Sequence, residues 1–176
     1  MDLSELLFVD VEASGLAPES YPIEVGWADL DGKTGSILIR PALGWTHWDS
    51  DAELMHCISR ARLAEKGTDP TVAAKHVAEI FKDRTLISDS PDYDGRWLAK
   101  LFGVADLTPP RLTHARSLIQ GIASDLKRTQ LDWTLALEQA DNLAPVLHRA
   151  AADALNMATA VRLFTQGRSI PDSVEA

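Results

Sequence analysis

The sequence contains one cysteine, Cys57, among 176 residues, and it has no internal repeat, no low-complexity tract and no Pro/Gly/Ser-rich linker. A single thiol excludes an internal disulfide and a thiolate metal cluster. We expect Cys57 to be a small buried side chain rather than a nucleophile. Without a linker, and with 45% hydrophobic residues, residues 1–176 are predicted to form one globular domain.

Long hydrophobic runs are also missing, and positive charge is scarce. No apolar stretch approaches the length of a membrane span, and the acidic start Met1–Glu5 does not resemble a signal peptide. We therefore expect a protein of the reducing cytoplasm that has no membrane partner. The 17 Lys and Arg residues are outnumbered by 26 Asp and Glu residues, which gives a net charge of −9. Such a chain is unsuited to coating long nucleic acids through non-specific charge, although it can still grip a short end of a strand.

The pattern of apolar residues predicts an α/β fold. Strands are predicted at Leu3–Val11, Tyr21–Leu30, Ser36–Arg40, Thr85–Ser88 and Arg111–Thr113, with a tight hairpin turn at Asp31-Gly32. Helices are predicted at Ala52–Lys66 with a break, at Thr71–Phe81 after the cap Asp69-Pro70, and at Asp92–Phe102, Ala115–Ser124, Leu126–Ala140 and Ala150–Gly167. Three strands joined by hairpins, followed by strands that alternate with helices, predict a mixed sheet flanked by helices.

Two carboxylates lie in the first apolar run, Leu6–Glu12. Asp10 and Glu12 are two residues apart on a strand, so their side chains project from the same face. They could merely cap the end of the strand. Two like charges so close repel each other unless a cation lies between them, and a divalent metal is the simplest such cation.

Three further residues have positions that suit the same site. Asp94 is predicted in the first turn of the helix that follows the strand Thr85–Ser88, and Asp153 lies near the start of the last helix. Each of these acids, taken alone, could be an ordinary helix N-terminal residue. His148 precedes Asp153 by five residues, about 140° of helical rotation, so we place it on the loop after Pro145. An imidazole there, beside fixed carboxylates, is typical of a general base next to metal ligands.

These residues, in this order, resemble the motifs of the DEDD 3′–5′ exonuclease superfamily, in its histidine-bearing (DEDDh) branch, which has an RNase H-like fold. The first motif is Asp10-Val11-Glu12, followed by Ser14-Gly15-Leu16 and by Ile23–Gly26 on the second strand. The third motif, His-x4-Asp, is His148 to Asp153, and it is the most specific of the three.

The second motif matches less completely. It corresponds to Tyr93-Asp94 with Leu98 four residues later, but many relatives have His-Asn where this chain has Asp89-Ser90. Asp89 and Asp92 therefore compete with Asp94 for the site.

The resemblance implies a two-metal phosphodiester hydrolase that releases nucleoside 5′-monophosphates from a 3′ end, with Mg²⁺ or Mn²⁺ as the cations. Oxygen ligands suit these ions, and the lack of clustered Cys or His argues against zinc. By resemblance, Asp10 bridges both ions, Glu12 and Asp153 hold the first, and Asp94 holds the second largely through water. His148 deprotonates the attacking water.

The resemblance also suggests contacts to the nucleic acid, at Ser14, Gly15, Leu16, His47, Trp48 and His56. Leu16 either wedges against the terminal base or belongs to the core. Exposed aromatic residues stack on bases, but ordinary packing is expected of at least one Trp among Trp45 and Trp48. Glu24 is expected to form a structural hydrogen bond beneath the site rather than to face solvent.

Three choices remain open in the sequence. The chain is similar to stand-alone exoribonucleases such as oligoribonuclease, which favours single-stranded or short RNA with a free 3′ end, but proofreading domains of DNA polymerases share the motifs. A homodimer is expected from such relatives. The alternatives to an exonuclease are a catalytically inactive nucleic-acid-binding or regulatory protein of RNase H-like fold, and an RNase H-like endonuclease.

Overall fold

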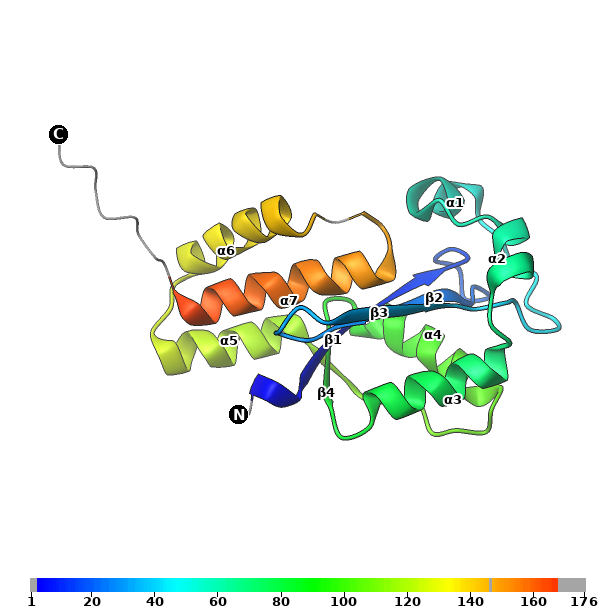
Figure 1. The fold of residues 1–176 in the computed structure, drawn as a ribbon, viewed down its shortest axis with the longest axis horizontal. Helices are drawn as coiled ribbons and strands as arrows, with labels where there is room; N and C mark the ends of the chain where they lie inside the picture. The colour runs from blue at the N-terminus through cyan, green and yellow to red at the C-terminus, as the bar shows by residue number, and fades with distance from the viewer. Residues whose placement is uncertain (1–2, 146, 168–176) are drawn as a thin grey trace.

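The computed structural model describes residues 3–145 and 147–167, and the predicted domain, 1–176, extends beyond them at both ends. At the centre of the described chain lies a five-stranded sheet in the order β3-β2-β1-β4-β5 (Figure 1). The strands are β1 (Leu6–Ala13), β2 (Pro22–Ala28), β3 (Thr34–Leu38), β4 (Thr85–Ser88) and β5 (Leu112–His114). β1, β2 and β3 pair antiparallel, whereas β1, β4 and β5 pair parallel. The predicted mixed α/β sheet is therefore confirmed.

The bounds of β1, β2, β3 and β5 differ from the prediction by one to three residues, and two of these differences have clear local reasons. Leu3–Glu5 forms a short 3-10 helix, so β1 begins at Leu6 and not at Leu3. The hairpin between β2 and β3 is wider than a two-residue turn, because Ala28 pairs with Thr34. The carboxylate of Asp29 closes this loop by accepting the backbone N–H groups of residues 31 and 33.

The helices are α1 (Ser50–His56), α2 (Arg60–Lys66), α3 (Pro70–Phe81), α4 (Pro91–Gly103), α5 (Ala115–Leu126), α6 (Gln130–Leu143) and α7 (Ala150–Gln166). The predicted start of α6 at Leu126 was wrong, because the capping box of Thr129 and Asp132 sets the start at Gln130. The expected break in the 52–66 helix lies at Cys57, whose backbone is left-handed at φ 54°. Cys57 is exposed and not buried as predicted, because it is the C-terminal cap of α1.

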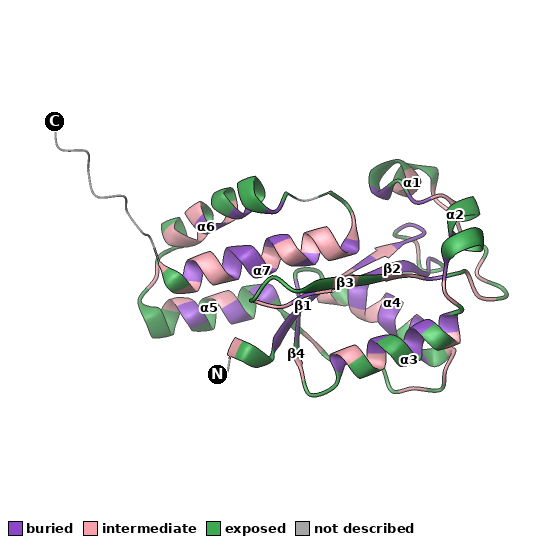
Figure 2. Ribbon diagram, viewed as in Figure 1, coloured by how far each residue is buried: buried purple, intermediate pink, exposed green. Residues whose placement is uncertain are grey.

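The sheet separates two layers of helices. On β1, Leu7, Val9, Val11 and Ala13 belong to a core shared with α3 and α4, whereas Leu6 and Phe8 belong to a core shared with α5, α6 and α7. Figure 2 shows these buried residues along the strands and on the inward faces of the helices. Because side chains alternate along a strand, Asp10 and Glu12 continue the row of Leu6 and Phe8 toward α7. No helix in the described part of the chain is long and apolar enough to cross a membrane.

Candidate metal centre

The acidic site lies at the carboxyl end of β1. Asp10 and Glu12 are both half-buried, and the residues opposite them on β2 are Gly26 and Glu24. The parallel neighbour, β4, ends at Ser88, so the loop that follows it starts beside the same end of β1. This placement follows from strand topology, since the carboxyl ends of adjacent parallel strands meet at one edge.

The loop after β4 and the first turn of α4 bring two more carboxylates to Asp10. Asp94 is buried, with 2% of its surface exposed, and the hydroxyl of Ser88 donates to its Oδ2 at 2.5 Å. Carboxylate oxygens of Asp10, Asp89 and Asp94 lie within 4.8 Å of one another. Asp92 belongs to no such group among the described residues. Of the two competitors raised by the sequence, the structure brings Asp89 to the cluster together with Asp94.

Asp153 completes a second group from the first turn of α7. Carboxylate oxygens of Asp10, Glu12 and Asp153 also lie within 4.8 Å of one another. The backbone N–H of Leu147 donates to Asp153 Oδ1 at 2.9 Å, which fixes this side chain on the cluster side of the helix start. The two groups of three carboxylates share Asp10, so this residue lies where two ligand sets meet.

Burial and mutual repulsion raise the pKa values of these carboxylates. Burial raises the pKa of Glu12 to about 7, and the charges of Asp153 and Glu24 add to the rise. Burial likewise raises the pKa of Asp94 to about 7, although the hydrogen bond from Ser88 opposes it. The pKa of Asp10 is raised well above its usual value by burial and then by Asp94 and Glu12. Burial also raises the pKa of Asp153.

The donor set fits one class of ligand. Both groups offer oxygen atoms alone, which suit hard divalent cations such as Mg²⁺ and Mn²⁺. A small hollow bordered by Asp10, Asp89, Asp153 and Met157 lies between β1, the β4 loop and α7. A cation there would offset the repulsion that raises the pKa values of the surrounding acids.

We expect the stability of the metal-free protein to fall as pH rises from about 5 to about 8. The carboxyls of Glu12 and Asp94 have pKa values near 4 in an unfolded chain and about 7 in the folded one. Between these values the folded state binds more protons, so a rise from pH 5 to pH 8 favours unfolding by about 5 kcal/mol for the two carboxyls together. Calorimetric unfolding in a chelator should show a midpoint lower by roughly 10 °C at the higher pH.

Buried His56 acts in the opposite direction, because burial lowers its pKa. The comparison of unfolding with and without Mg²⁺ at each pH therefore isolates the carboxylates. The ion should raise the midpoint most at high pH, where the acids are ionised. A stabilisation by Mg²⁺ that is the same at every pH would contradict this account.

Two residues of β2, Glu24 and Gly26, hold the start of α7 close to the sheet beside the site. Glu24 was predicted to form hydrogen bonds beneath the site, and it accepts bonds from Arg149, Ser36 and the backbone N–H of Ala150. At Gly26, two residues on and on the same face, an added Cβ would lie 2.1 Å from the carbonyl carbon of Ala150. Only glycine allows this approach. Arg149 was not predicted from the sequence, where only its position next to His148 marks it.

His148 lies on the loop before α7, as the spacing predicted, with its backbone in the left-handed region at φ 48°. Its side chain is exposed, and together with Glu12 it borders an apolar hollow whose other walls include Leu16, Met55 and Trp97. Burial raises the pKa of Asp153, and a positive charge on His148 would oppose that rise, so the two residues lie near enough to interact electrostatically.

The loop after β1 shapes one wall of this hollow. Leu16 is 65% exposed, which excludes the alternative that it belongs to the core. Ser14 is fully buried; its hydroxyl accepts the N–H of Tyr21 and lies 3.2 Å from Nδ1 of His47. Gly15 has φ 139°, and a Cβ there would lie 2.7 Å from Cε1 of His47. Ser14, Gly15 and His47 thus fix the backbone from which Leu16 projects.

The other predicted contact residues are held by protein partners. The indole N–H of Trp48 donates to Glu53 at 2.6 Å, and Trp45 stacks on Tyr21 at 5.3 Å between ring centroids. His56 is 2% exposed, its ring accepts the N–H of residue 58, and the residue also lines the hollow. Packing is therefore a role of both tryptophans.

Helix α4 anchors the loop that carries Leu16. Arg96 donates to the carbonyl of Leu16, Trp97 donates to the hydroxyl of Ser20, and Lys100 donates to the carbonyls of Glu19 and Ser20. The spacing of these donors, at 96, 97 and 100, places them on one helix face. The same helix therefore positions both Asp94 and the loop after β1 that carries Leu16.

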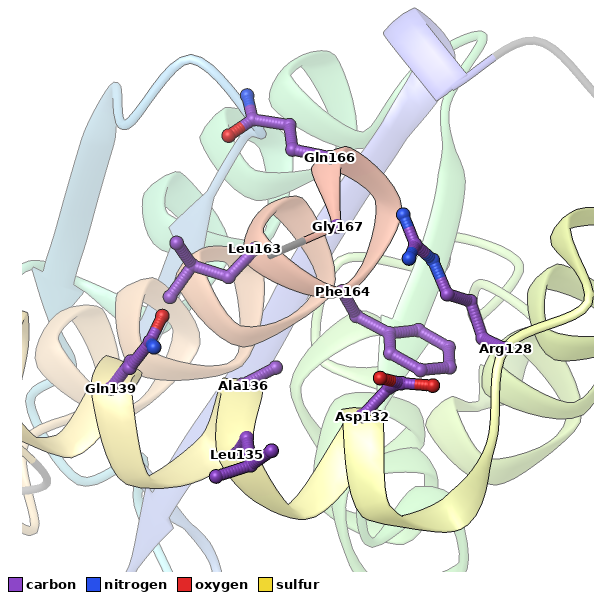
Figure 3. A pocket seen from close by; sticks show the side chains of 9 residues that line it. All are labelled: Arg128, Asp132, Leu135, Ala136, Gln139, Leu163, Phe164, Gln166 and Gly167. Carbon is purple, nitrogen blue, oxygen red and sulfur yellow. The ribbon is translucent and has the colours of Figure 1, made fainter. Parts of the chain in front are cut away.

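A further hollow lies between α6 and the end of α7 (Figure 3). It is lined by Arg128, Asp132, Leu135, Ala136, Gln139, Leu163, Phe164, Gln166 and Gly167. Its acidic side chain, Asp132, belongs to the capping box of α6. Asp153 lies at the opposite end of α7, about 20 Å away along the helix axis, so this hollow is separate from the carboxylate site.

No protein-family model matches the sequence, and no curated protein matches it. Solved structures do match. The zinc-bound form of Escherichia coli exonuclease I with single-stranded DNA superposes with a TM-score of 0.70 at 16% identity, over 92% of this chain and 40% of that one. The metal-free form of the same complex gives 0.66 at 15%, over 93% and 40%. Exonuclease I from Methylocaldum szegediense gives 0.68 at 16%, over 93% and 40%.

At this identity the likeness shows the fold. The chain has the fold of the matched part of exonuclease I, and the predicted RNase H-like α/β architecture is confirmed. The described sheet and helices account for about two fifths of the length of those exonucleases.

Proposed function

We propose that this protein is a metal-dependent 3′–5′ exonuclease acting on single-stranded or short nucleic acid. The proposal rests on one observation: two sets of three carboxylates meet at the carboxyl end of β1, and Asp10 belongs to both sets. The fold supports it, because part of exonuclease I has the same architecture and that protein has been solved with single-stranded DNA and with a bound zinc ion. The net charge of −9 also favours a grip on a short end over a long duplex.

Each of the two sets of three carboxylates would hold one divalent cation. Asp10, Glu12 and Asp153 form the first set, and Asp10, Asp94 and Asp89 form the second. When bound, the cations activate the attacking water and stabilise the leaving 3′ oxygen. Because Asp89 lies within 4.8 Å of Asp10 and Asp94, we include it as a ligand beside the four acids of the motifs.

The remaining residues of the site act on the nucleic acid and on the proton. His148, exposed on its loop and bordering the same hollow as Glu12, takes the proton of the attacking water. Leu16, Met55 and Trp97 border the apolar hollow beside Glu12 and would receive the terminal base, with the exposed Leu16 against its face. Ser14, Gly15 and His47 would act through the shape of the loop, His56 as part of the wall of the hollow, and Trp48 by packing against His56.

Whether the substrate is RNA or DNA is tested by comparing both in the same assay. The motifs resemble those of stand-alone exoribonucleases, which favours RNA, whereas exonuclease I was solved with single-stranded DNA. RNA and DNA oligomers of the same sequence, each labelled at the 5′ or the 3′ end, should be incubated with Mg²⁺, Mn²⁺ or Zn²⁺ and with excess chelator.

We expect nucleoside 5′-monophosphates, a 5′-labelled ladder that shortens by single nucleotides, and no product in the chelator. RNA should be degraded faster than DNA. Internal fragments would instead identify an endonuclease, and binding without any product would identify an inactive nucleic-acid-binding protein. Full turnover in excess chelator would rule out the carboxylate-held cations.

A further inference from the structure

One ion pair ties the start of α7 to the sheet. Arg149 Nε donates to Glu24 Oε2 at 2.9 Å, and its Nη2 donates to Oε1 at 2.8 Å. The two residues are 125 positions apart in the chain. Glu24 is 1% exposed and Arg149 is 35% exposed. This two-bond geometry is the strong form of an Arg–carboxylate contact, and it fixes orientation as well as distance.

The same carboxylate replaces an ordinary helix cap. Arg149 is the N-cap residue of α7, a position where Ser, Thr, Asp or Asn usually satisfies the first N–H groups. Its side chain makes no cap bond and reaches down to Glu24 instead, and Glu24 accepts the N–H of Ala150 at 3.3 Å. A buried anion at a helix N-terminus is also favoured by the helix dipole. The start of α7 is thus capped by a side chain of β2.

His148 comes immediately before this anchor, and its backbone is in the left-handed region, at φ 48°. Its imidazole makes no hydrogen bond to another residue in the described part of the chain. Its position therefore depends on the backbone anchors around it. One is the bond from Leu147 N–H to Asp153, and the other is the pair of Arg149 with Glu24.

We infer that the Arg149–Glu24 pair is a positioning clamp that holds His148 at the distance from the carboxylates at which it can deprotonate water. This inference rests on the proposed function, because it assigns Arg149 a role that acts through the general base. Asp153 depends less on the clamp, since α7 also packs on β1 and β2 and lies against Gly26. Loss of the clamp should therefore displace the base and leave the metal ligands in place.

The test is a set of variants in two backgrounds. Arg149→Met removes the guanidinium and keeps a long side chain, and Arg149→Lys keeps the charge while losing the two-bond geometry. Both should be made in the native protein and in His148→Ala. We expect Arg149→Met to lower kcat about 10²-fold, the scale of a small misplacement of a reacting group. KM and the affinity for Mn²⁺ should not change, and Arg149→Lys should retain more activity than Arg149→Met.

In the His148→Ala background, Arg149→Met should cause no further loss of kcat, because the group it positions is absent. An equal loss in both backgrounds would overturn the inference, and so would a rise in KM with kcat unchanged, which would mean that Arg149 binds the substrate. Glu65→Gln is the matched control, since it removes one carboxylate from the exposed pair of Lys66 and Glu65. It should leave kcat unchanged.

A second measurement does not need nuclease activity. In protein labelled with ¹³C at the histidine rings, the signal lost in His148→Ala identifies His148, and relaxation reports the mobility of its ring. We expect Arg149→Met, and Glu24→Gln to a smaller degree, to increase that mobility. Unchanged ring mobility in both variants would overturn the clamp even in a folded, active enzyme. If the native protein degrades no substrate, the proposed function fails, while the ring signal still decides the clamp.

Discussion

Replacing Asp10 with Asn is expected to lower the rate of nucleotide release by about 10³-fold or more. Asp10 belongs to both carboxylate groups, so its loss weakens both cation sites at once. Bound divalent ions supply several kcal/mol of transition-state stabilisation, and each 1.4 kcal/mol corresponds to about a tenfold change in rate. The rate should be measured with labelled oligomers at saturating Mn²⁺, so that weak binding of the ion is not mistaken for lost chemistry.

The same substitution should stabilise the metal-free protein. Burial and the neighbouring acids raise the pKa of Asp10, so an ionised carboxylate there is unfavourable when no cation is bound. The midpoint of unfolding in a chelator should therefore rise at neutral pH, while stabilisation by Mg²⁺ should shrink. Asp92→Asn is the matched control, because Asp92 lies in the first turn of α4 but outside both groups. If Asp92→Asn were inactive and Asp10→Asn active, the site would be misassigned.

Replacing His148 with Ala is expected to lower the rate by roughly 10²–10⁴-fold, the usual scale of general-base catalysis. Since His148 is exposed and outside both carboxylate groups, the variant should bind Mn²⁺ and a 3′ end nearly as well as the native protein. Its stability should fall by no more than about 1 kcal/mol, because the lost side chain is exposed and the main cost is Ala in the left-handed region at residue 148.

The decisive comparison is between His148→Ala and Asp153→Asn in a calorimetric titration with Mn²⁺. Asp153→Asn should lose affinity for the ion, because Asp153 shares a ligand group with Asp10 and Glu12. An equal loss of affinity in both variants would make His148 a ligand and end its assignment as the base. A His148→Ala variant with the native rate would remove His148 from the mechanism altogether.

The strands, the helices and most of the acidic residues could be predicted from the sequence because their signals are local. The alternation around Asp10 and Glu12 places both carboxylates on one face of β1 whatever the rest of the chain does. The spacing of His148 and Asp153 likewise separates a loop residue from a helix residue. Thr85–Ser88 has the same bounds in the sequence prediction and in the structure.

Side-chain environment was harder to predict, and Cys57 shows why. A lone cysteine in an apolar sequence is usually buried, but here the chain leaves α1 through a left-handed residue that turns its side chain outward. The start of α6 failed in a similar way, since Leu126 continues a helical pattern that Lys127 ends by a left-handed turn. In both places the apolar pattern continues past a cap that depends on backbone geometry.

Local sequence patterns were sufficient to predict the α/β class, the order of the motifs and the carboxylates that a strand or helix start must present together. The choice between Asp89 and Asp92 required the folded chain, because their approach to Asp10 depends on how β1 and β4 pair and where α4 begins. It alone joined Arg149 to Glu24, since the pairing of residues 125 positions apart leaves no trace in a local pattern. Long-range contacts are set by the packing of whole elements, and sequence periodicity reports the faces of those elements but not their partners.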